Sequence, residues 1–393
     1  MNRITHATPH VAQPSTLSKV AERDLLDRGF SRRNFGRLAT LLGAGAALPF
    51  YNEPALAQLS QVKGMPADAV KINANENPLG PCPEALEAIY SAAKLGGRYT
   101  YELTDDFRET LATQEGVAPD YVQPYPGSSM PLHLSVIAFT SPTKSFVISD
   151  PGYEAGERAA KFIGAKVIRV PLTKTFAHDV KAMAAADANA GVIYICNPNN
   201  PTGTLTPMAD IEWLVANKPA GSIIVLDEAY IHLTGAEMGS KFVQQNKDVI
   251  LLRTFSKIYG MAGIRAGAAI GKPELLAKMS AFQAGALPST GMAAAAASLK
   301  SKKLVPERRK IIADVREDTL SFMDKHNFKY VPSVSNKFMV DVKRPGNDII
   351  MALRNEKVYI GRVWSSMPTY VRVSIGTKDE MAKFKTAFLK VMA

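Results

Sequence analysis

Short apolar runs alternate with helix-length segments along most of the chain. Two segments, 84–94 and 105–116, have the spacing of amphipathic helices. Six apolar runs are strand candidates, at 146–149, 166–170, 192–195, 223–226, 249–252 and 266–270. Strands that are apolar on both faces and separated by helices are typical of a largely parallel sheet covered on both sides. The pattern therefore predicts an α/β domain with a mostly parallel central sheet.

The pattern changes after residue 303. Residues 304–327 read as one long amphipathic helix. Strand candidates at 338–342, 358–360 and 370–374 and a closing helix at 379–391 follow it. We expect a large domain at 96–303 and a small α+β domain at 304–393. Residues 58–95 are expected to form an N-terminal segment that joins the small domain.

Residues 1–57 have the composition of an export signal rather than of a domain. Arg32 and Arg33 precede Phe35 and a mild, Gly- and Ala-rich apolar run at 38–50. A small-x-small site, Ala55-Leu56-Ala57, comes next. This order predicts a twin-arginine signal peptide at 1–57 and a periplasmic or secreted mature chain. The alternative is an amphipathic N-terminal helix, and the protein is cytoplasmic if the signal is not used.

Composition and charge exclude several classes of protein. The chain has 393 residues, 46% of them hydrophobic, and a formal net charge of +11. No uncharged apolar run reaches 18 residues, so we expect no membrane span. The positive charge indicates either a basic surface or attraction of anionic substrates. No dense basic run with interleaved aromatic residues is present, which argues against nucleic-acid binding.

Cysteines and histidines give no sign of a metal site. Cys82 and Cys196 lack the spacing of metal ligands, and we expect buried thiols, with a disulfide as the alternative in an exported chain. No metal or nucleophile pattern surrounds the histidines, which are expected to be structural or surface residues: His133, His178, His232 and His326. The predicted metal content is none.

Polar residues follow four of the predicted strands directly. They are the segments Asp150–Tyr153, Asn197–Gly203, Asp227–Tyr230 and Arg253–Lys257. Ligands of open α/β sheets gather at the carboxyl ends of the strands. An aromatic ring, amides, an acid and a lysine are therefore expected to converge at one edge of the sheet.

These groups match what pyridoxal phosphate (PLP) needs. A lysine amine forms an imine with the cofactor, and a carboxylate keeps the pyridine nitrogen protonated. An aromatic face can stack on the ring, and a donor can hold its 3-oxygen. The phosphate favours the amides of a helix start plus a cation. Residues 127–131 open a predicted helix at 132–139 with two hydroxyls, and Arg265 can supply the cation.

Four motifs carry a resemblance to a known family. They are NANENPLGP at 73–81, CNPNNPTG at 196–203, LDEAY at 226–230 and RTFSKIYGMAGIRAG at 253–267. Together, in this order, they resemble histidinol-phosphate aminotransferases and their relatives among the class I/II aminotransferases. The likeness runs from about Lys71 to the C-terminus, and it implies the fold of type I PLP enzymes, a three-layer α/β/α architecture.

The resemblance implies a role for each matching residue around the cofactor. Lys257 resembles the Schiff-base lysine and proton shuttle, and Asp227 the partner of the pyridine nitrogen. Asn200 and Tyr230 resemble the donors to the 3-oxygen, and Tyr153 the stacking ring. The residues that resemble the phosphate cup are Ser128, Ser129, Ser256 and Arg265. Each side chain also has a structural alternative, such as packing for the tyrosines.

Further residues are implied in substrate binding and assembly. Arg372 resembles the arginine that clamps a substrate carboxylate. Arg362 and Asn77 are additional substrate-binding candidates, with a structural role left open for Arg362. Tyr99 resembles the tyrosine that reaches the phosphate of the neighbouring subunit, which implies a homodimer. The chain departs from the family at Ser129-Met130, where an acidic pair is usual, and at Thr100, where proline is usual.

The predicted function is amino-group transfer by a ping-pong mechanism through an imine on Lys257. The donor is an amino acid, or an amino-alcohol phosphate such as histidinol phosphate, and the acceptor is a 2-oxo acid. Decarboxylation and oxygen-dependent oxidation on the same scaffold are alternatives, as is a non-catalytic binding protein. Because histidine biosynthesis is cytoplasmic, the predicted export signal argues for another substrate.

Overall fold

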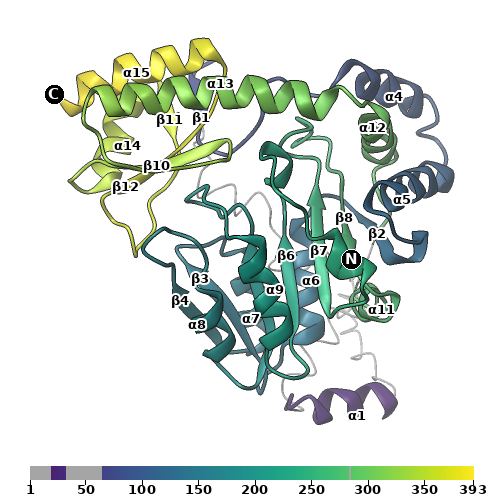
Figure 1. The fold of residues 1–393 in the computed structure, drawn as a ribbon. Helices are drawn as coiled ribbons and strands as arrows, with labels where there is room; N and C mark the ends of the chain where they lie inside the picture. Colours follow the sequence, from purple (N-terminus) through teal and green to yellow (C-terminus); the bar gives the residue numbers. More distant parts are fainter. Residues whose placement is uncertain (1–18, 32–63, 283–284) are drawn as a thin grey trace, which may run out of the picture.

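The computed structural model describes residues 19–31, 64–282 and 285–393 (Figure 1). The predicted twin arginines, apolar run and cleavage site lie outside these residues. A large domain carries the main sheet, and a smaller domain lies above it in Figure 1. Among the described residues, no helix combines the length and apolar character that crossing a membrane requires.

The main sheet has seven strands in the order β2-β8-β7-β6-β5-β3-β4. Their bounds are β2 (Val122–Tyr125), β3 (Ser145–Asp150), β4 (Val167–Pro171), β5 (Ala190–Cys196), β6 (Ile223–Asp227), β7 (Val249–Thr254) and β8 (Gly267–Ile270). Strands β3 to β7 pair in parallel, while β8 is antiparallel to β7 and to β2. Every residue of β5, β6 and β7 is buried, as expected for a sheet covered on both faces. The predicted α/β architecture is confirmed.

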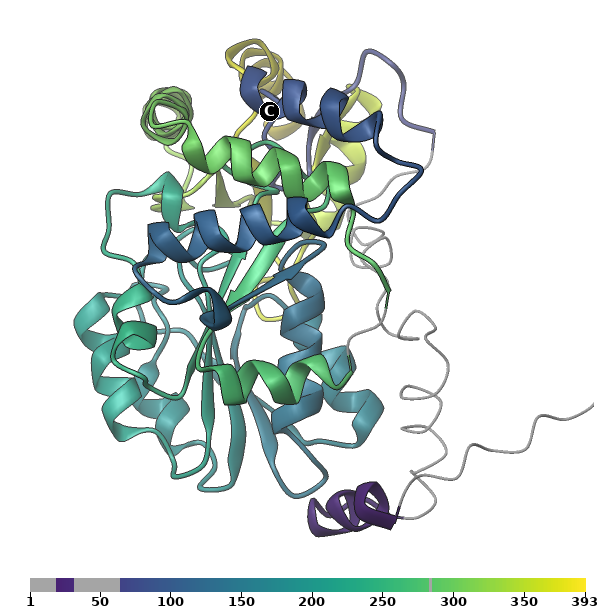
Figure 2. The ribbon, with the colours of Figure 1, turned by 90° about the vertical axis from the view of Figure 1, so that its right-hand side faces the viewer.

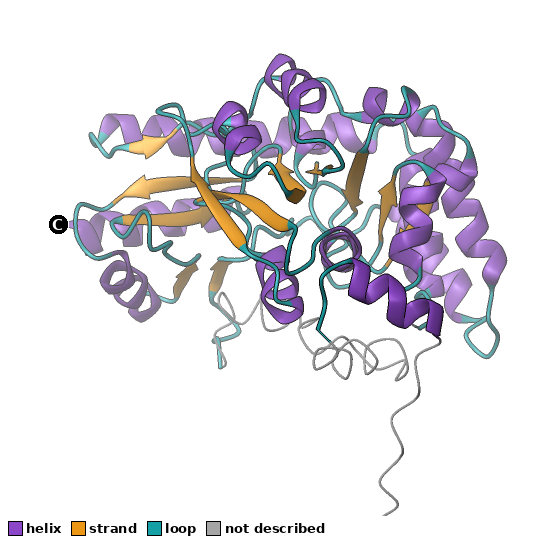
Figure 3. Cartoon of the chain, turned by 90° about the horizontal axis from the view of Figure 1, so that it is seen from below, coloured by secondary structure: helices purple, strands orange, loops and turns teal. Residues whose placement is uncertain are grey.

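Helices cover both faces of this sheet (Figures 2 and 3). One face carries α6 (Ser129–Phe139), α7 (Ala155–Ile163) and α11 (Pro273–Ser280), and the other carries α8 (Val180–Ala185) and α9 (Met208–Asn217). Beside the sheet, α12 (Ser289–Lys300) packs against α4 (Pro83–Ala93) and α5 (Tyr101–Glu115). Shorter elements are η1 (Pro119–Tyr121), η2 (Ile231–Leu233) and α10 (Ser240–Gln244). These layers fix the strand ends where the predicted site residues lie.

The small domain contains two small sheets and three helices. Its strands are β9 (Tyr330–Val331), β10 (Lys337–Asp341), β11 (Val358–Ile360) and β12 (Tyr370–Ser374). Strand β10 is antiparallel to β9 and β12, whereas β1 (Val70–Ile72) pairs in parallel with β11. The helices are α13 (Leu304–Lys325), α14 (Gly346–Asn355) and α15 (Lys378–Met392). Residues 70–72, far from β11 in sequence, thus join the small domain.

The segment upstream of the predicted twin arginines packs on the large domain. Helix α1 (Lys19–Asp27) lies at the end of the large domain away from the small domain (Figures 1 and 2). Leu25 and Phe30 are buried. The Arg28 guanidinium donates to the Ile137 carbonyl oxygen at 2.8 Å, at the carboxyl end of α6, where a cation is favoured.

Candidate active site

A cavity of about 470 Å³ lies between the strand ends of the large domain and the small domain. It brings together all but two of the predicted site residues. Those that line it are Ser128, Ser129, Tyr153, Asn200, Asp227, Tyr230, Ser256, Lys257, Arg265, Arg362 and Arg372. Residues from β5, β6 and β7 meet there because parallel strands end at the same edge of the sheet.

Asp227 ends β6 as a buried carboxylate at the cavity. The Tyr194 hydroxyl donates to its Oδ2 at 2.8 Å, and the Ala229 amide donates to its Oδ1 at 3.1 Å. Burial raises the pKa of Asp227, and the hydrogen bond from Tyr194 opposes that rise. Both donors are uncharged, so a positively charged donor in the cavity would stabilise the carboxylate further. The protonated pyridine nitrogen of PLP is such a donor.

Lys257 lies in the loop after β7, on the floor of the same cavity. Its Nζ is 3.5 Å from the Ala74 carbonyl oxygen and 5.7 Å from the centre of the Tyr230 ring. The amine thus lies beside the ring whose hydroxyl is predicted to bind the cofactor. Lys257 and Asp227 both reach the cavity, as an imine-forming lysine and a ring-nitrogen partner must.

Asn200 and Tyr230 are arranged to donate to a ligand. The Asn200 oxygen accepts from Arg372 Nη1 at 3.0 Å and from Asn75 Nδ2 at 3.3 Å. Its Nδ2 is therefore the group that can donate into the cavity. The Tyr230 oxygen accepts from Asn75 Nδ2 at 3.1 Å, which leaves its proton for a ligand. Asn75 was not among the predicted site residues, although it lies in the NANENPLGP motif.

Hydroxyls and a guanidinium gather at the amino end of α6. Ser128 and Ser129 begin the helix, where amide groups favour an anion. Arg265 donates to the Ser256 hydroxyl at 3.3 Å and to the Pro126 carbonyl oxygen at 2.8 Å. This group fits a phosphate. Thr254, which sequence reasoning missed, adds a hydroxyl that donates to Ser256 at 3.0 Å.

Gly127 is required by the close approach of this arginine. A Cβ atom at Gly127 would overlap Arg265 Nη2, and the φ of Gly127 is +96°. Any side chain would displace the guanidinium and strain the backbone. The glycine before the two serines therefore lets the cation reach the amino end of α6.

Arg372 supplies a buried cation at the opposite side of the cavity. Its Nη2 donates to the Asn73 carbonyl oxygen at 2.6 Å, and its Nε has no hydrogen-bond partner among the described residues. Burial, together with nearby Arg362, lowers the pKa of Arg372 to about 10, while Tyr230 acts in the opposite direction. Both guanidiniums lie over the Trp364 ring, Arg362 at 4.0 Å and Arg372 at 5.4 Å from its centre. The pair favours an anionic ligand.

Arg362 and Tyr99 differ in how they relate to this cavity. Arg362 lines it but also forms an ion pair with Glu154, so that it connects the small domain to the large one. Tyr99 does not line the cavity; its side chain is 76% exposed and stacks on Tyr101. Such exposure suits contact with another molecule.

Asn77 lies outside the cavity lining. Its Nδ2 donates to the Ile258 carbonyl oxygen at 3.0 Å, and its Oδ1 accepts from the Leu79 amide at 3.1 Å. These bonds shape the turn and tie it to the loop of Lys257. The residues of this motif that line the cavity are Ala74, Asn75 and Glu76.

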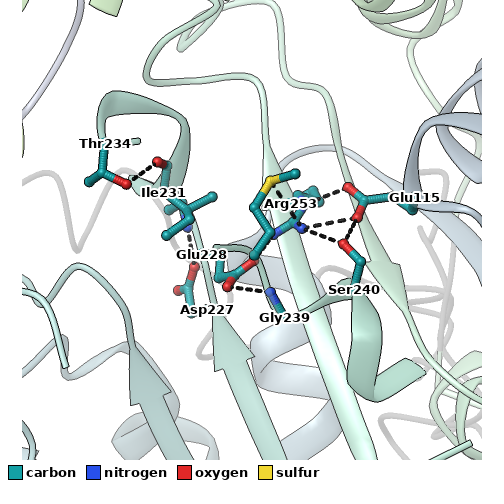
Figure 4. Close-up of polar contacts among 10 residues, drawn as sticks. Glu115, Asp227, Glu228, Ile231, Thr234, Gly239, Ser240 and Arg253 are labelled. Atoms are coloured by element: carbon teal, nitrogen blue, oxygen red, sulfur yellow. Dashed lines mark hydrogen bonds and ion pairs between the residues drawn. The ribbon is translucent and has the colours of Figure 1, made fainter. Parts of the chain in front are cut away.

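A buried ion cluster lies behind the strand ends (Figure 4). Arg253 Nε donates to Glu115 Oε1 at 2.7 Å, and Arg253 Nη1 pairs with Glu228. Glu228 also accepts from the Gly239 amide at 2.8 Å, and Ser240 donates to Glu115. Burial raises the pKa of Glu228, while Arg253 acts in the opposite direction. The cluster fixes the peptide that follows Asp227, and sequence reasoning gave Arg253 no role.

Both cysteines are buried and free. Cys196, at the end of β5, lines the cavity, and burial raises the pKa of its thiol. Within the described residues, no group of three His, Cys, Asp or Glu side chains could hold a metal ion.

Comparisons with known proteins agree with this geometry. Residues 67–388 match the family Aminotransferase class I and II. The chain is 32% identical over 337 residues to a histidinol-phosphate aminotransferase from Moorella thermoacetica, covering 83% of this chain and 86% of that one. It is 32% identical over 324 residues to the enzyme of that name from Symbiobacterium thermophilum, covering 81% and 90%.

A solved structure has the same architecture. The histidinol-phosphate aminotransferase from Sinorhizobium meliloti, in complex with pyridoxal-5'-phosphate, superposes with a TM-score of 0.76 at 25% identity. The match covers 88% of this chain and 95% of that one. The acid, the lysine and the hydroxyl-lined helix start of the cavity fit the cofactor of such enzymes. The chain belongs to the class I and II aminotransferases, a family of PLP enzymes.

Proposed function

We propose that this aminotransferase moves an amino group between an α-amino acid and a 2-oxo acid. The observation that carries the proposal is the buried Arg372, which lines the cavity and whose Nε lacks a partner among the described residues. Its hydrogen-bond acceptors are the neutral oxygens of Asn200 and Asn73. A buried guanidinium is stabilised by a carboxylate. The α-carboxylate of a substrate would supply it.

Each residue has a separate task in the proposed reaction. PLP, when bound, supplies the aldehyde that takes the amino group and the ring that accepts electrons released at Cα. Lys257 Nζ moves a proton to and from the substrate Cα, and Asp227 holds the proton of the pyridine nitrogen. Asn200 and Tyr230 would donate to the 3-oxygen, and Tyr153 would cover the ring. Ser128, Ser129, Ser256 and Arg265 would hold the phosphate.

An amino-alcohol phosphate such as histidinol phosphate is the alternative donor. The relatives carry that name, and Arg362 with Arg372 could bind a phosphate in place of a carboxylate. The ion pair of Arg362 with Glu154 reduces the net positive charge on that side of the cavity, which favours the singly charged carboxylate.

The substrate class can be tested by comparing amino donors that differ in their acidic group. An amino acid, the amine that lacks its α-carboxylate, and histidinol phosphate are each assayed with 2-oxoglutarate, and products are identified by mass spectrometry. The proposal predicts that the amino acid is the donor and that Arg372→Gln raises its KM by roughly 100-fold or more. An equal KM for the amine would contradict it. Carbon dioxide release or oxygen uptake without an acceptor would instead indicate decarboxylation or oxidation.

We propose export for the mature chain. The order of twin arginines, apolar run and small-x-small site at residues 32–57 supports it. A twin-arginine route carries folded proteins, which suits an enzyme that takes up its cofactor first. N-terminal sequencing of protein from the periplasm should give Gln58 as the first residue. An unprocessed N-terminus there would contradict the proposal.

We also propose a homodimer. Three tyrosines, on α4, on the loop after it and at the start of α5, are strongly exposed: Tyr90 at 68%, Tyr99 at 76% and Tyr101 at 70%. Exposed aromatic groups of this kind are typical of interfaces. Sedimentation of the holoenzyme should give twice the chain mass, and Tyr99→Phe should weaken PLP binding if its hydroxyl reaches the phosphate of the other subunit. A monomer that retains full PLP affinity would contradict this assembly.

A further inference from the structure

Lys337 is a second lysine beside the predicted cofactor position. It begins β10 in the small domain, and its side chain is 0% exposed. Its Nζ lies 3.1 Å from the centre of the Tyr230 ring and donates to the Ser335 hydroxyl at 2.9 Å. The proposed reaction assigns this amine no task.

The surroundings of Lys337 make it energetically unfavourable to bury an amine at this position. Burial lowers the pKa of Lys337 well below its usual range, and Arg372 and Lys257 lower it further, whereas Cys196 and Asp227 act in the opposite direction. An unbranched apolar side chain such as methionine could fill the same space without burying a polar group. The amine therefore calls for an interaction that an apolar side chain cannot make, and the face of the Tyr230 ring provides one.

The segment that carries Lys337 reaches Tyr230 by a second route. Asn336 Nδ2 donates to the Asn75 carbonyl oxygen at 3.1 Å, and Asn75 Nδ2 donates to the Tyr230 oxygen at 3.1 Å. Residues 335–337 thus contact the ring directly and the hydroxyl through one intermediate residue. The small domain thus contacts the Tyr230 ring through Lys337 and is connected to its hydroxyl through Asn336 and Asn75.

We propose that Lys337 is a positioning residue that holds the Tyr230 ring and makes its hydroxyl a stronger donor to the 3-oxygen of PLP. The N–H groups of the amine on the ring face draw electron density from the phenol, which strengthens the O–H donor. A stronger donor at the 3-oxygen stabilises its anion and competes for the proton shared with the Lys257 nitrogen. The inference rests on the proposed cofactor position.

The test follows the visible absorbance of the purified holoenzyme from pH 5 to pH 10. Lys337→Met should raise the pH midpoint of the spectral transition by about half a unit, which corresponds to the typical strength of an N–H contact with an aromatic face. Lys337→Gln keeps a donor for Ser335 and provides a second variant if the methionine does not fold. The matched control is Lys329→Met, an exposed lysine near the same sheet, which should keep the wild-type midpoint.

A double-mutant cycle separates action through Tyr230 from a general effect. In a Tyr230→Phe background, Lys337→Met should shift the midpoint by less than about 0.2 units. An unchanged midpoint in both folded Lys337 variants, or an equal shift in the Tyr230→Phe background, would overturn the inference. A wild-type protein with no cofactor absorbance would overturn the proposed cofactor site, and with it this role.

Discussion

Arg372 Nη1 donates to Asn200 Oδ1 at 3.0 Å, so that the predicted substrate arginine is bonded to a predicted cofactor residue. Arg372 comes from β12 of the small domain, and Asn200 follows β5 of the large domain. The bond connects the two domains across the cavity. It also orients the Asn200 amide so that its nitrogen faces a ligand.

Replacing Asn200 with aspartate should weaken substrate binding. The new carboxylate would pair with Arg372 and compete with the substrate carboxylate for the guanidinium. We expect a rise in KM for the amino acid of about 10-fold or more, together with a smaller loss of kcat from the missing amide donor. Steady-state kinetics over a range of donor concentrations measures both. An unchanged KM would show that the substrate does not contact Arg372.

Asp227→Asn should separate cofactor binding from the stability of the apoprotein. The folded pKa of Asp227 is raised by burial, so the ionised carboxylate destabilises the apoprotein above the unfolded pKa. The amide should leave the free energy of unfolding at pH 7 unchanged or raise it by about 1 kcal/mol. PLP affinity should fall at the same time. Urea unfolding of the apoprotein and a PLP titration measure the two effects, and a large loss of apoprotein stability would contradict the account.

Arg253→Met should destabilise the protein strongly. It would leave the carboxylates of Glu115 and Glu228 buried without their cation, which typically costs about 3 to 5 kcal/mol. Lys241→Met is the matched control, because Lys241 pairs with acids at the surface. Its loss should lower the free energy of unfolding by less than about 1 kcal/mol. Urea unfolding measures both variants. Similar losses of unfolding free energy in the two variants would show that the buried ion cluster stabilises the protein no more than a surface ion pair does.

Buried histidines should make the protein sensitive to acid. Burial lowers the pKa of His178 to about 4, whereas an unfolded histidine has a pKa near 6.5. The unfolded chain therefore takes up a proton first as the pH falls below about 6.5. The contribution of His178 to stability is complete above that pH and is lost progressively toward pH 4, at up to about 1.4 kcal/mol per pH unit.

The change of stability with pH tests this directly. His178→Gln should flatten the plot of unfolding free energy against pH in the window from about 6.5 down to about 4. His326→Gln, at an exposed position, is the control for the substitution itself. Equal slopes for wild type and His178→Gln would contradict the proposed titration.

The sequence predicted the parallel strands well because their burial on both faces leaves continuous apolar runs. Strand β2 of the main sheet was not predicted, because it has four residues, contains Pro124 and carries neither an apolar run nor an alternating pattern. Proline is tolerated there because β2 is an edge strand. Its position depends on pairing with β8, more than a hundred residues later, which local pattern does not encode.

The site residues divide in the same way, into those that local sequence predicts and those that depend on contacts with distant parts of the chain. Lys257, Asp227 and Arg265 could be placed because each follows a strand end or belongs to a motif. Asn75 and Lys337 were missed, since their roles depend on the small domain folding over the strand ends. Contacts between domains join distant parts of the chain, and a single sequence holds no direct signal for them.

The central claim is that Lys257 carries the cofactor and the proton transfer. Lys257→Ala holoenzyme should lose both the pH-dependent visible absorbance of the bound cofactor and transamination, with kcat reduced by about 10⁴-fold or more. Lys272→Ala, a surface lysine paired with Asp248, should retain both. A purified Lys257→Ala protein that kept the absorbance and the activity would contradict the account.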